Sequence, residues 1–341
     1  MKMKKTVAVG VAVSMLCLLT GCGDTGTDAG QTTQAAQTQQ SAQETQETAA
    51  ETGSEESTEG QAFKVGNIMI TSAGQSDQLN DQAIHDFFEE RGGEVVTLDM
   101  EIDIVKANQC IEDLIALGVD GIVLNGISWE GHNSAIREAY DAGIPVIVGY
   151  NRVTCDEYVI AQVHSDDYGA GVAAGEDCIE KTGGTGKVFI LDNPGASCVE
   201  DRTDGFEATV VEAGMTVAAT MSCSGVEDSQ ATVSDLLQAH PDVAAIMCNC
   251  DLAATGAIAA LRAAGLAGEV LVYAVDGNQE NLQFIADGMQ AGTSFTNNYN
   301  IGYTMAETMY NYLCGETIEE KDISLPITFV NSDNVQEFLE K

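Results

Sequence analysis

From residue 63 onward, short apolar runs rich in β-branched residues alternate with stretches in which apolar residues recur at three- and four-residue steps. The apolar runs predict strands at 65–70, 94–98, 121–124, 145–148 and 158–163. The stretches between them predict amphipathic helices at 77–91, 104–117 and 131–142, each followed by glycine as at helix C-termini. This alternation indicates a parallel sheet covered by helices on both faces.

The same alternation begins again in the second half of the chain. Strands are predicted at 187–191, 215–221, 243–247, 270–275, 292–295 and 327–330. Helices are predicted at 168–181, 199–213, 229–239, 252–264, 279–287 and 301–313. Two successive series of this kind predict two similar doubly wound α/β domains.

The segment 147–175 connects the two series. Its first strand ends in the polar cluster Tyr150, Asn151 and Arg152, and its second extended run leads into a polar turn at 164–167 and a new helix. Side chains just past the carboxyl end of a parallel strand face the binding crevice. A cleft between two domains is also a favoured ligand site. We therefore expect Asn151 and Arg152 to contact a ligand where the domains meet.

Composition limits the possible partners. The chain has 341 residues, which suggests two domains plus appendages. Its net charge is −39, from 14 basic and 53 acidic residues. Such a surface is repelled by phosphate backbones, so no nucleic-acid partner is expected, and the acidity is ascribed to solubility.

The N-terminus is typical of an export signal. Lys2, Lys4 and Lys5 precede an apolar core at 7–19, and small residues then lead to Cys22. The order Leu-Thr-Gly-Cys resembles a bacterial lipobox, which implies cleavage before Cys22 and lipid attachment to its thiol. The alternative is an ordinary secretory signal that ends by chance in a cysteine.

After the predicted signal peptide, residues 1–22, the segment 23–61 is built from Gln, Thr, Ala, Ser, Gly and Glu. It carries too little apolar surface to offset the entropy of ordering, so we expect a disordered tether. Lipid and tether together predict a protein anchored to the cell membrane on its extracytoplasmic face.

Eight cysteines follow Cys22. An even number of cysteines in an exported chain suits a disulfide framework, but a chain of this size needs no cross-links, and several cysteines lie in apolar surroundings. The sequence leaves both states open. Cys248 and Cys250 form a close pair, but no second pair at ligand spacing accompanies it, so no metal site is expected.

Five segments, in this order, resemble the sugar-binding proteins of ABC transporters, the ribose/galactose-binding type of periplasmic binding protein: "AGIPVIVGYNR", "VHSDDYGAGVAAGE", "GASCVEDRTDGFEA", "LLQAHPDVAAIMCNCDLAATGAIAAL" and "VYAVDGN". The resemblance implies two doubly wound lobes joined by three crossovers near Ser165, Thr296 and Pro326. The implied lobes are 62–165 plus 297–326, and 166–296 plus 327–341.

The resemblance also implies ligand-binding residues. Asn151-Arg152 stands where the family usually carries Asp-Arg, Arg202 matches an Arg-x-x-Gly-Phe motif, and Asp276 is the family's strand-end acid. Sugar hydroxyls both donate and accept hydrogen bonds, which suits carboxylates, amides and guanidinium groups. The alternatives are a loop arginine paired with an acid for Arg152, a surface ion pair for Arg202 and a simple turn for Asp276.

Cys250-Asp251 stands where the family commonly shows Asn-Asp. Cys250 hydrogen-bonds weakly, so one ligand contact is expected to be lost or taken over by Asn249. Asp251 is expected either to contact ligand or to serve as the N-cap of the next helix.

The segment 71–77 replaces a family stretch whose paired aromatic residues stack on sugar rings. Gln75 and Ser76 are expected to offer polar contacts there instead. Trp129, Tyr150 and Phe295 are the candidates for an aromatic residue that stacks on the sugar instead. For Trp129, packing on the surface of its own domain is an equal alternative. Thr296 or Asn297, at the second crossover, is expected to supply a last polar contact.

The sequence indicates no enzyme. The glycines in 169–175 begin inside a predicted helix, which favours close helix packing over a dinucleotide site, and no catalytic triad or carboxylate dyad can be assembled. No cofactor is expected. We predict a monomeric lipoprotein that captures a small polar ligand, in the first place a monosaccharide, and delivers it to an ABC permease. The alternatives are a polyol or furanosyl signal molecule as ligand, and a binding subunit coupled to a sensor or chemoreceptor.

Overall fold

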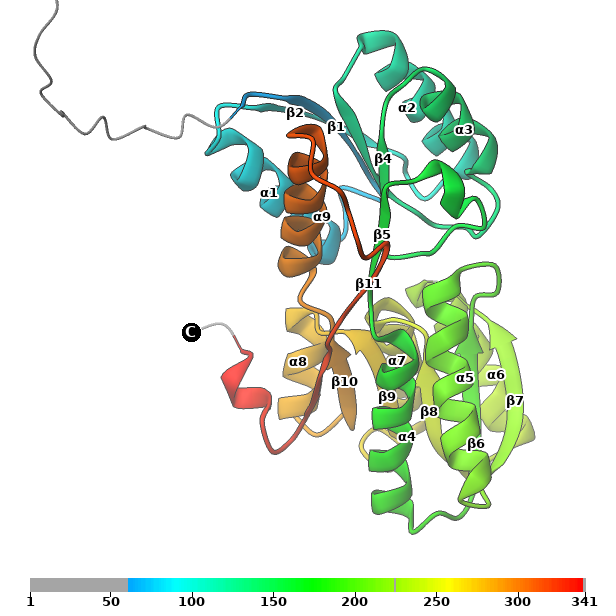
Figure 1. Cartoon of the computed structure of the whole chain (residues 1–341). Coiled ribbons are helices and arrows are strands. Elements are labelled where there is room, and N and C mark those ends of the chain that lie inside the picture. The colour runs from blue at the N-terminus through cyan, green and yellow to red at the C-terminus, as the bar shows by residue number, and fades with distance from the viewer. Residues whose placement is uncertain (1–60, 224, 340–341) are drawn as a thin grey trace, which may run out of the picture. The chain divides into compact units, whose positions relative to one another are not determined.

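The computed structural model describes residues 61–339, except residue 224. The predicted signal peptide, the lipidation site Cys22 and all but the last residue of the predicted tether lie outside the described residues. Within 61–339, no helix has both the length and the apolar character that crossing a membrane requires. The described strands form two separate sheets (Figure 1). We call each sheet, with the helices that pack on it, lobe 1 and lobe 2.

Lobe 1 is built on a sheet in which every neighbouring pair of strands is parallel. In spatial order its strands are β11 (Asp322–Leu325), β5 (Ala161–Ser165), β4 (Val146–Gly149), β3 (Gly121–Asn125), β1 (Lys64–Met69) and β2 (Glu94–Asp99). The core on one face includes α2 (Ile104–Leu117) and α3 (Asn133–Asp141), and the core on the other includes α1 (Gln75–Glu89) and α9 (Asn298–Leu313). Helices α1 and α9 lie side by side although they are far apart in the chain (Figure 1).

Lobe 2 repeats this plan with one antiparallel edge strand, β12. In spatial order its strands are β12 (Thr328–Asn331), β10 (Gly292–Phe295), β9 (Leu271–Asp276), β8 (Val243–Cys248), β6 (Lys187–Asp192) and β7 (Thr216–Ser222). Helices α4 (Asp167–Thr182) and α5 (Ser197–Glu212) contribute to the core on one face. The core on the other face includes α6 (Val226–Ala239), α7 (Asp251–Ala264) and α8 (Gln279–Ala286).

Within the described residues the chain passes between the lobes three times: from β5 to α4, from β10 to α9, and from β11 to β12. The predicted fold class, two doubly wound domains with three crossovers, is therefore confirmed. Strand β11 was not predicted. It has four residues at the edge of its sheet, with exposed and partly buried positions in alternation, so it lacks the apolar run that marks the inner strands. The 3₁₀ helices η1 (Asp156–Tyr158) and η2 (Val335–Glu337) are too short to show a period.

The glycines in 169–175 let α4 and α5 approach each other closely. A Cβ atom added to Gly171 would collide with the carbonyl oxygen of Arg202, and one added to Gly205 would collide with the carbonyl oxygen of Tyr168. Backbone cannot move aside as a flexible side chain can, so these positions require glycine. The interpretation as helix packing is confirmed for Gly171 and Gly175, which face α5, whereas a Cβ atom on Gly169 would meet the Asp166 side chain. The packing fixes the backbone that carries Arg202.

The eight cysteines of the described chain are free thiols, and Cys314 alone among them is exposed. Cys178 and Cys248 are fully buried in the core of lobe 2, where cysteine acts as a small apolar residue.

Candidate functional site

A cavity of about 500 Å³ lies between the carboxyl ends of the two sheets. Its lining includes residues that follow or end three strands of lobe 1 and three of lobe 2. These residues are Ile70, Ile127, Tyr150, Asn193, Asn249 and Asp276. Small-molecule sites usually measure about 300 to 1,000 Å³. The cavity is therefore of a size to hold a small ligand between the lobes.

Arg202 is the charged centre of the cavity wall in lobe 2. Its Nε donates to the Asp167 carboxylate at 2.7 Å, and its Nη1 donates to the Asn249 carbonyl at 2.9 Å and lies 3.8 Å from the Asp276 carboxylate. The side chain is 8% exposed. Burial by itself lowers the pKa of the guanidinium, but the neighbouring Asp167 raises that pKa above its ordinary value, so the charge is kept. Nη2 forms no hydrogen bond to any described residue and is left for a ligand.

Asp276 ends β9 in a strained backbone conformation, with φ of 127°. Non-glycine residues rarely adopt a positive φ, and such strain concentrates at functional sites. Tyr150, on the lobe 1 side of the same cavity, also has a positive φ, 63°. Ile102, with a φ of 59°, is a third such residue, so three of the non-glycine positions with positive φ in the described chain line one cavity.

Asp251 holds the backbone turn that follows Asp276. Its fully buried carboxylate accepts hydrogen bonds from the backbone of Gly277 at 2.9 Å and Asn278 at 2.6 Å, and from the Thr293 hydroxyl at 2.9 Å. Burial raises the pKa of both Asp251 and Asp276, and at Asp276 the positive charge of Arg202 opposes the rise. Asp251 therefore positions the turn and does not line the cavity.

The expected N-cap role of Asp251 is wrong. Cys250 occupies the N-cap position of α7 and makes no side-chain cap hydrogen bond, and Asp251 is the first helical residue. Cys250 itself lines the cavity beside Asn249, as expected for the family's Asn-Asp position.

Asn151 lines the cavity but uses its amide to hold the lobes together. Its Nδ2 donates to the Gly126 carbonyl at 2.8 Å within lobe 1. Its Oδ1 accepts hydrogen bonds from the Ser197 hydroxyl at 3.3 Å and from the Cys198 backbone at 3.2 Å, both in lobe 2. These contacts leave the amide of Asn151 little capacity to bind a ligand.

Asp77 also lines the cavity, although it was not among the predicted ligand-binding residues. Burial raises the pKa of its carboxyl to about 7, and the negative charges of Asp276 and Asp99 add to the rise. It lies in the first turn of α1, one residue after Ser76, which also lines the cavity and donates to Asn278 Oδ1 of lobe 2 at 3.1 Å. The only signal in the sequence was an acid directly after the polar pair Gln75-Ser76.

Arg152 lies outside the cavity. Its Nη2 is 2.6 Å from the Asp201 carboxylate of lobe 2, and its guanidinium lies 5.3 Å from the centre of the Trp129 ring. Trp129 borders a separate, smaller cavity of about 380 Å³ with Gly195 and Glu200 of lobe 2. Arg152 and Trp129 thus lie where the lobes touch, beside the cavity rather than in its wall.

Three further predicted residues also lie outside the lining. Gln75 Oε1 accepts a hydrogen bond from the Gln279 backbone of lobe 2 at 3.4 Å. The Thr296 hydroxyl donates to the Asp276 carbonyl at 3.5 Å, and Asn297 caps α9 by accepting from the Asn300 backbone at 3.2 Å. Gln75 thus joins the two lobes, and Thr296 and Asn297 hold the crossover between β10 and α9.

The apolar part of the wall is aliphatic. Of the candidate aromatics, Tyr150 lines the cavity, whereas Phe295 packs against Phe338 with ring centres 5.3 Å apart. The other large apolar groups of lobe 1 in the lining are Ile70, Ile102, Ile104 and Ile127. These isoleucines were not predicted, because the related family stretch carries aromatic side chains at this wall.

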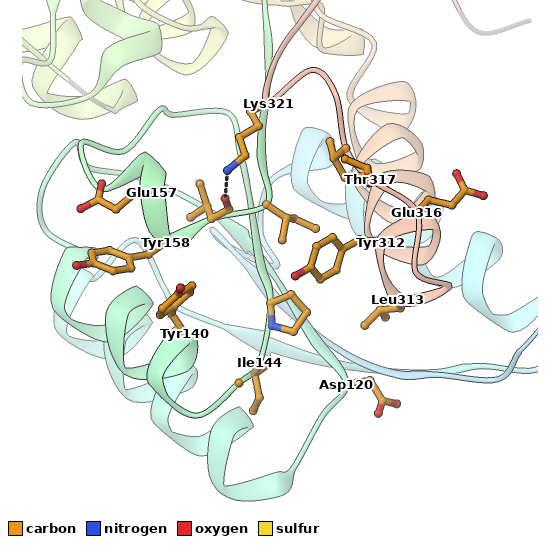
Figure 2. A pocket seen from close by; sticks show the side chains of 15 residues that line it. Asp120, Tyr140, Ile144, Glu157, Tyr158, Tyr312, Leu313, Glu316, Thr317 and Lys321 are labelled. Carbon is orange, nitrogen blue, oxygen red and sulfur yellow. Dashed lines mark hydrogen bonds between the residues drawn. The ribbon is translucent and has the colours of Figure 1, made fainter.

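A second cavity, of about 610 Å³, lies at the opposite, amino edge of the lobe 1 sheet, where three tyrosines surround it (Figure 2). These are Tyr140, Tyr158 and Tyr312, and Lys321 at its rim donates to the Val159 carbonyl at 3.5 Å. Every residue of this lining belongs to lobe 1. It therefore cannot couple a ligand to contact between the lobes, and the interlobe cavity is the candidate site.

Two doubly wound lobes, three crossovers and a polar cavity lined by both lobes define the class of two-lobed solute-binding proteins. The periplasmic binding protein domain matches residues 65–317. The chain belongs to this family, which confirms the resemblance that its sequence segments indicated.

The relatives are solute-binding proteins. The chain is 30% identical to the ribose import binding protein RbsB of Bacillus subtilis over 239 residues, which cover 70% of this chain and 77% of that protein. It is 26% identical to the fructose import binding protein FruE of Bifidobacterium longum over 288 residues, 81% of this chain and 86% of that protein. A Mycobacterium smegmatis ABC transporter solute-binding protein with bound glycerol has a similar structure, with a TM-score of 0.77 and 26% identity over 82% of this chain and 98% of that one.

Proposed function

We propose that this protein captures a small polyhydroxyl ligand, in the first place a monosaccharide, in the interlobe cavity and presents it to an ABC importer. One observation carries the proposal: polar side chains of both lobes, Asp77 and Ser76 from lobe 1 and Arg202 and Asp276 from lobe 2, line the same cavity. The relatives named for ribose and fructose import support it.

The lining suits a sugar. Arg202 offers donors, Asp276 offers acceptors, and the Ser76 hydroxyl offers both, which matches hydroxyl groups that both donate and accept. The isoleucine wall offers an apolar surface for the carbon skeleton. A buried polar group left without a partner costs about 1–3 kcal/mol, so a compound that lacks one hydroxyl is discriminated against.

Ligand binding is coupled to closure of the lobes. Contacts that join the lobes surround the cavity: Ser76 with Asn278, Arg152 with Asp201, and the Asn151 amide with α5. A ligand held by groups of both lobes binds the closed form better, and it therefore shifts the population toward that form.

The rim of the cavity supports delivery to a permease. Ile102 and Leu252 line the cavity on opposite lobes and are 65% and 52% exposed, and Val105 nearby in the chain is 78% exposed. Exposed apolar groups at a polar rim are typical of protein interaction sites. In the proposed arrangement the protein is a monomer held on the extracytoplasmic face by lipid on Cys22, with lobes 62–165 plus 297–326 and 166–296 plus 327–341.

A polyol or furanose is the second candidate ligand, and the aliphatic wall favours it. A pyranose usually stacks on aromatic rings, and Tyr150 is the one aromatic residue that the described lining contributes. Similar folds hold myo-inositol in a Bacillus halodurans protein and L-arabinofuranose in a Shewanella protein.

A thermal-shift screen tests the proposal. Pentoses, hexoses, polyols and nucleosides are added to the parent protein, to Asp276→Ala and to Asp235→Ala, which removes an exposed acid of lobe 2 as a control. A ligand at 100 times its Kd stabilises the native state by about 2.7 kcal/mol, which raises the Tm by several degrees. The parent and Asp235→Ala are expected to respond to the same sugar or polyol and Asp276→Ala is not. A nucleoside as the only hit, no hit at all, or an unchanged response of Asp276→Ala contradicts the proposal.

A further inference from the structure

Carboxylates outnumber cations around the interlobe cavity. Asp77 and Asp276 line it, and Asp167 lies directly behind Arg202. Arg202 is the only basic residue in the described lining, and its short 2.7 Å contact is with Asp167. Asp167 alone therefore carries enough negative charge to balance the single positive charge of Arg202.

Asp77 has no cationic partner among the described residues. The charges that act most strongly on it, those of Asp276 and Asp99, are both negative. Arg152, which lies beside the cavity, is held by Asp201 at 2.6 Å. Arg202 Nη1 lies 3.8 Å from the Asp276 carboxylate, so Asp276 shares this single cation with Asp167, and Asp77 is left without one among the described residues.

Closure takes Asp77 and Asp276 out of bulk water, and a buried carboxylate without a partner is costly. The cost falls either when a carboxyl binds a proton or when the ligand brings a positive charge. Burial already raises the pKa of Asp77 to about 7, so at neutral pH proton binding is only partial. An ammonium group offers three hydrogen-bond donors and no acceptor, which matches acceptor-only carboxylates.

The Tyr150 hydroxyl is a further group without a partner. It is buried, belongs to a residue that lines the cavity, and forms no hydrogen bond to any described residue. Burial raises the pKa of this hydroxyl, and the negative charges of Asp77 and Asp276 add to the rise.

We propose that the ligand of this cavity is a cationic polyhydroxyl compound, an amine-bearing sugar or polyol, whose ammonium group faces Asp77 and Asp276. The inference rests on the proposed function and specifies its ligand class. The hydroxyls of the ligand bind Arg202 and Ser76, and its carbon skeleton packs on the isoleucine wall. Asp77 is then the residue that distinguishes an amine from a hydroxyl at the same position.

Matched pairs of compounds test the inference by calorimetric titration at pH 7. Each pair places an ammonium or a hydroxyl on the same carbon of one skeleton: 1-amino-1-deoxysorbitol with sorbitol, and the 2-, 3- and 6-amino-deoxy forms of glucose and galactose with the parent sugars. N-acetylglucosamine serves as a neutral control for size. At least one amine is expected to bind ten-fold or more tightly than its hydroxyl partner.

Two variants assign the preference to a residue. Asp77→Asn keeps the shape of the side chain and removes its charge, and it is expected to weaken binding of the amine until the ratio of the two Kd values is close to one. Glu112→Gln removes an exposed acid of α2 in the same lobe and is expected to keep the ratio of the parent protein.

Three outcomes overturn the inference, and they are distinguishable. Neutral compounds that bind as tightly as their amines in every pair refute the charged ligand class and leave the proposed function standing. A preference for the amine that persists in Asp77→Asn refutes the role of Asp77. Failure of both series to bind refutes the inference together with the proposed function.

Discussion

Replacement of Arg202 by methionine should destabilise lobe 2 even without ligand. Asp167, Arg202 and Asn249 all belong to this lobe, so their contacts do not depend on closure. Asp167 is 3% exposed, and its partner Arg202 is 6% exposed. Removing one partner of a buried ion pair leaves an uncompensated charge, which costs about 3–5 kcal/mol. Since typical native proteins are stable by only about 5–15 kcal/mol, this is a large part of the total.

Urea unfolding of the ligand-free protein, followed by circular dichroism, measures this cost. With a slope of about 1–3 kcal/mol per molar urea, the midpoint of Arg202→Met should fall by about 1 to 5 M. Arg262→Met removes an exposed arginine of α7 in the same lobe and should keep the midpoint close to that of the parent.

The double variant Arg202→Met with Asp167→Asn separates charge from packing. The asparagine leaves no buried charge, so the double variant should be at least about 1 kcal/mol more stable than Arg202→Met alone. It should still fail to bind ligand. The reasoning is refuted if Arg202→Met unfolds at the midpoint of the parent, or if Asp167→Asn brings no recovery.

Three other predictions follow from single contacts. Arg152→Ala removes a partly exposed interlobe ion pair with Asp201, which is worth about 0.2–1 kcal/mol, so ligand affinity measured by calorimetry should fall by no more than about five-fold, and less in high salt. Burial lowers the pKa of His132 from 6.5 to about 4, so as the pH falls the unfolded state binds a proton before the folded state does. The urea midpoint of the parent should therefore fall as the pH drops from 6.5 to 4, and the midpoint of His132→Gln should fall less steeply. Gly171→Ala forces a methyl group against the Arg202 carbonyl, so the Tm of this variant should drop. In Gly195→Ala the new methyl group would have no atom within 4 Å, but the backbone φ is 99°, so this variant reports the cost of backbone strain alone.

The inner strands and most helices could be predicted because burial on both faces leaves a continuous apolar run or a clear helical period. Strand β11 could not, because an edge strand of four residues needs no such run. Its existence depends on pairing with β5, which is a contact between residues about 160 positions apart.

The site was partly predictable for a related reason. Arg202 and Asp276 line the cavity because strand ends and helix starts face the crevice. This rule can be applied without knowing which side chains of the other lobe lie nearby. Arg152 follows a strand end as well, but the carboxylate of Asp201 from the other lobe competes for it, and no spacing in the sequence shows that pairing. Asp77 was missed because its distinguishing property, negative neighbours without a cation, arises only after folding.

Closure of the lobes on a ligand is the central claim, and the fluorescence of Trp129 tests it most directly. The chain has a single tryptophan, whose backbone donates to the Gly195 carbonyl of lobe 2 at 3.2 Å and whose ring lies 5.3 Å from the Arg152 guanidinium. A compound that raises the Tm should therefore change the emission of the ligand-free protein in a saturable way, with the same Kd as in calorimetry. Emission that stays constant while such a compound saturates the protein would contradict closure between the lobes.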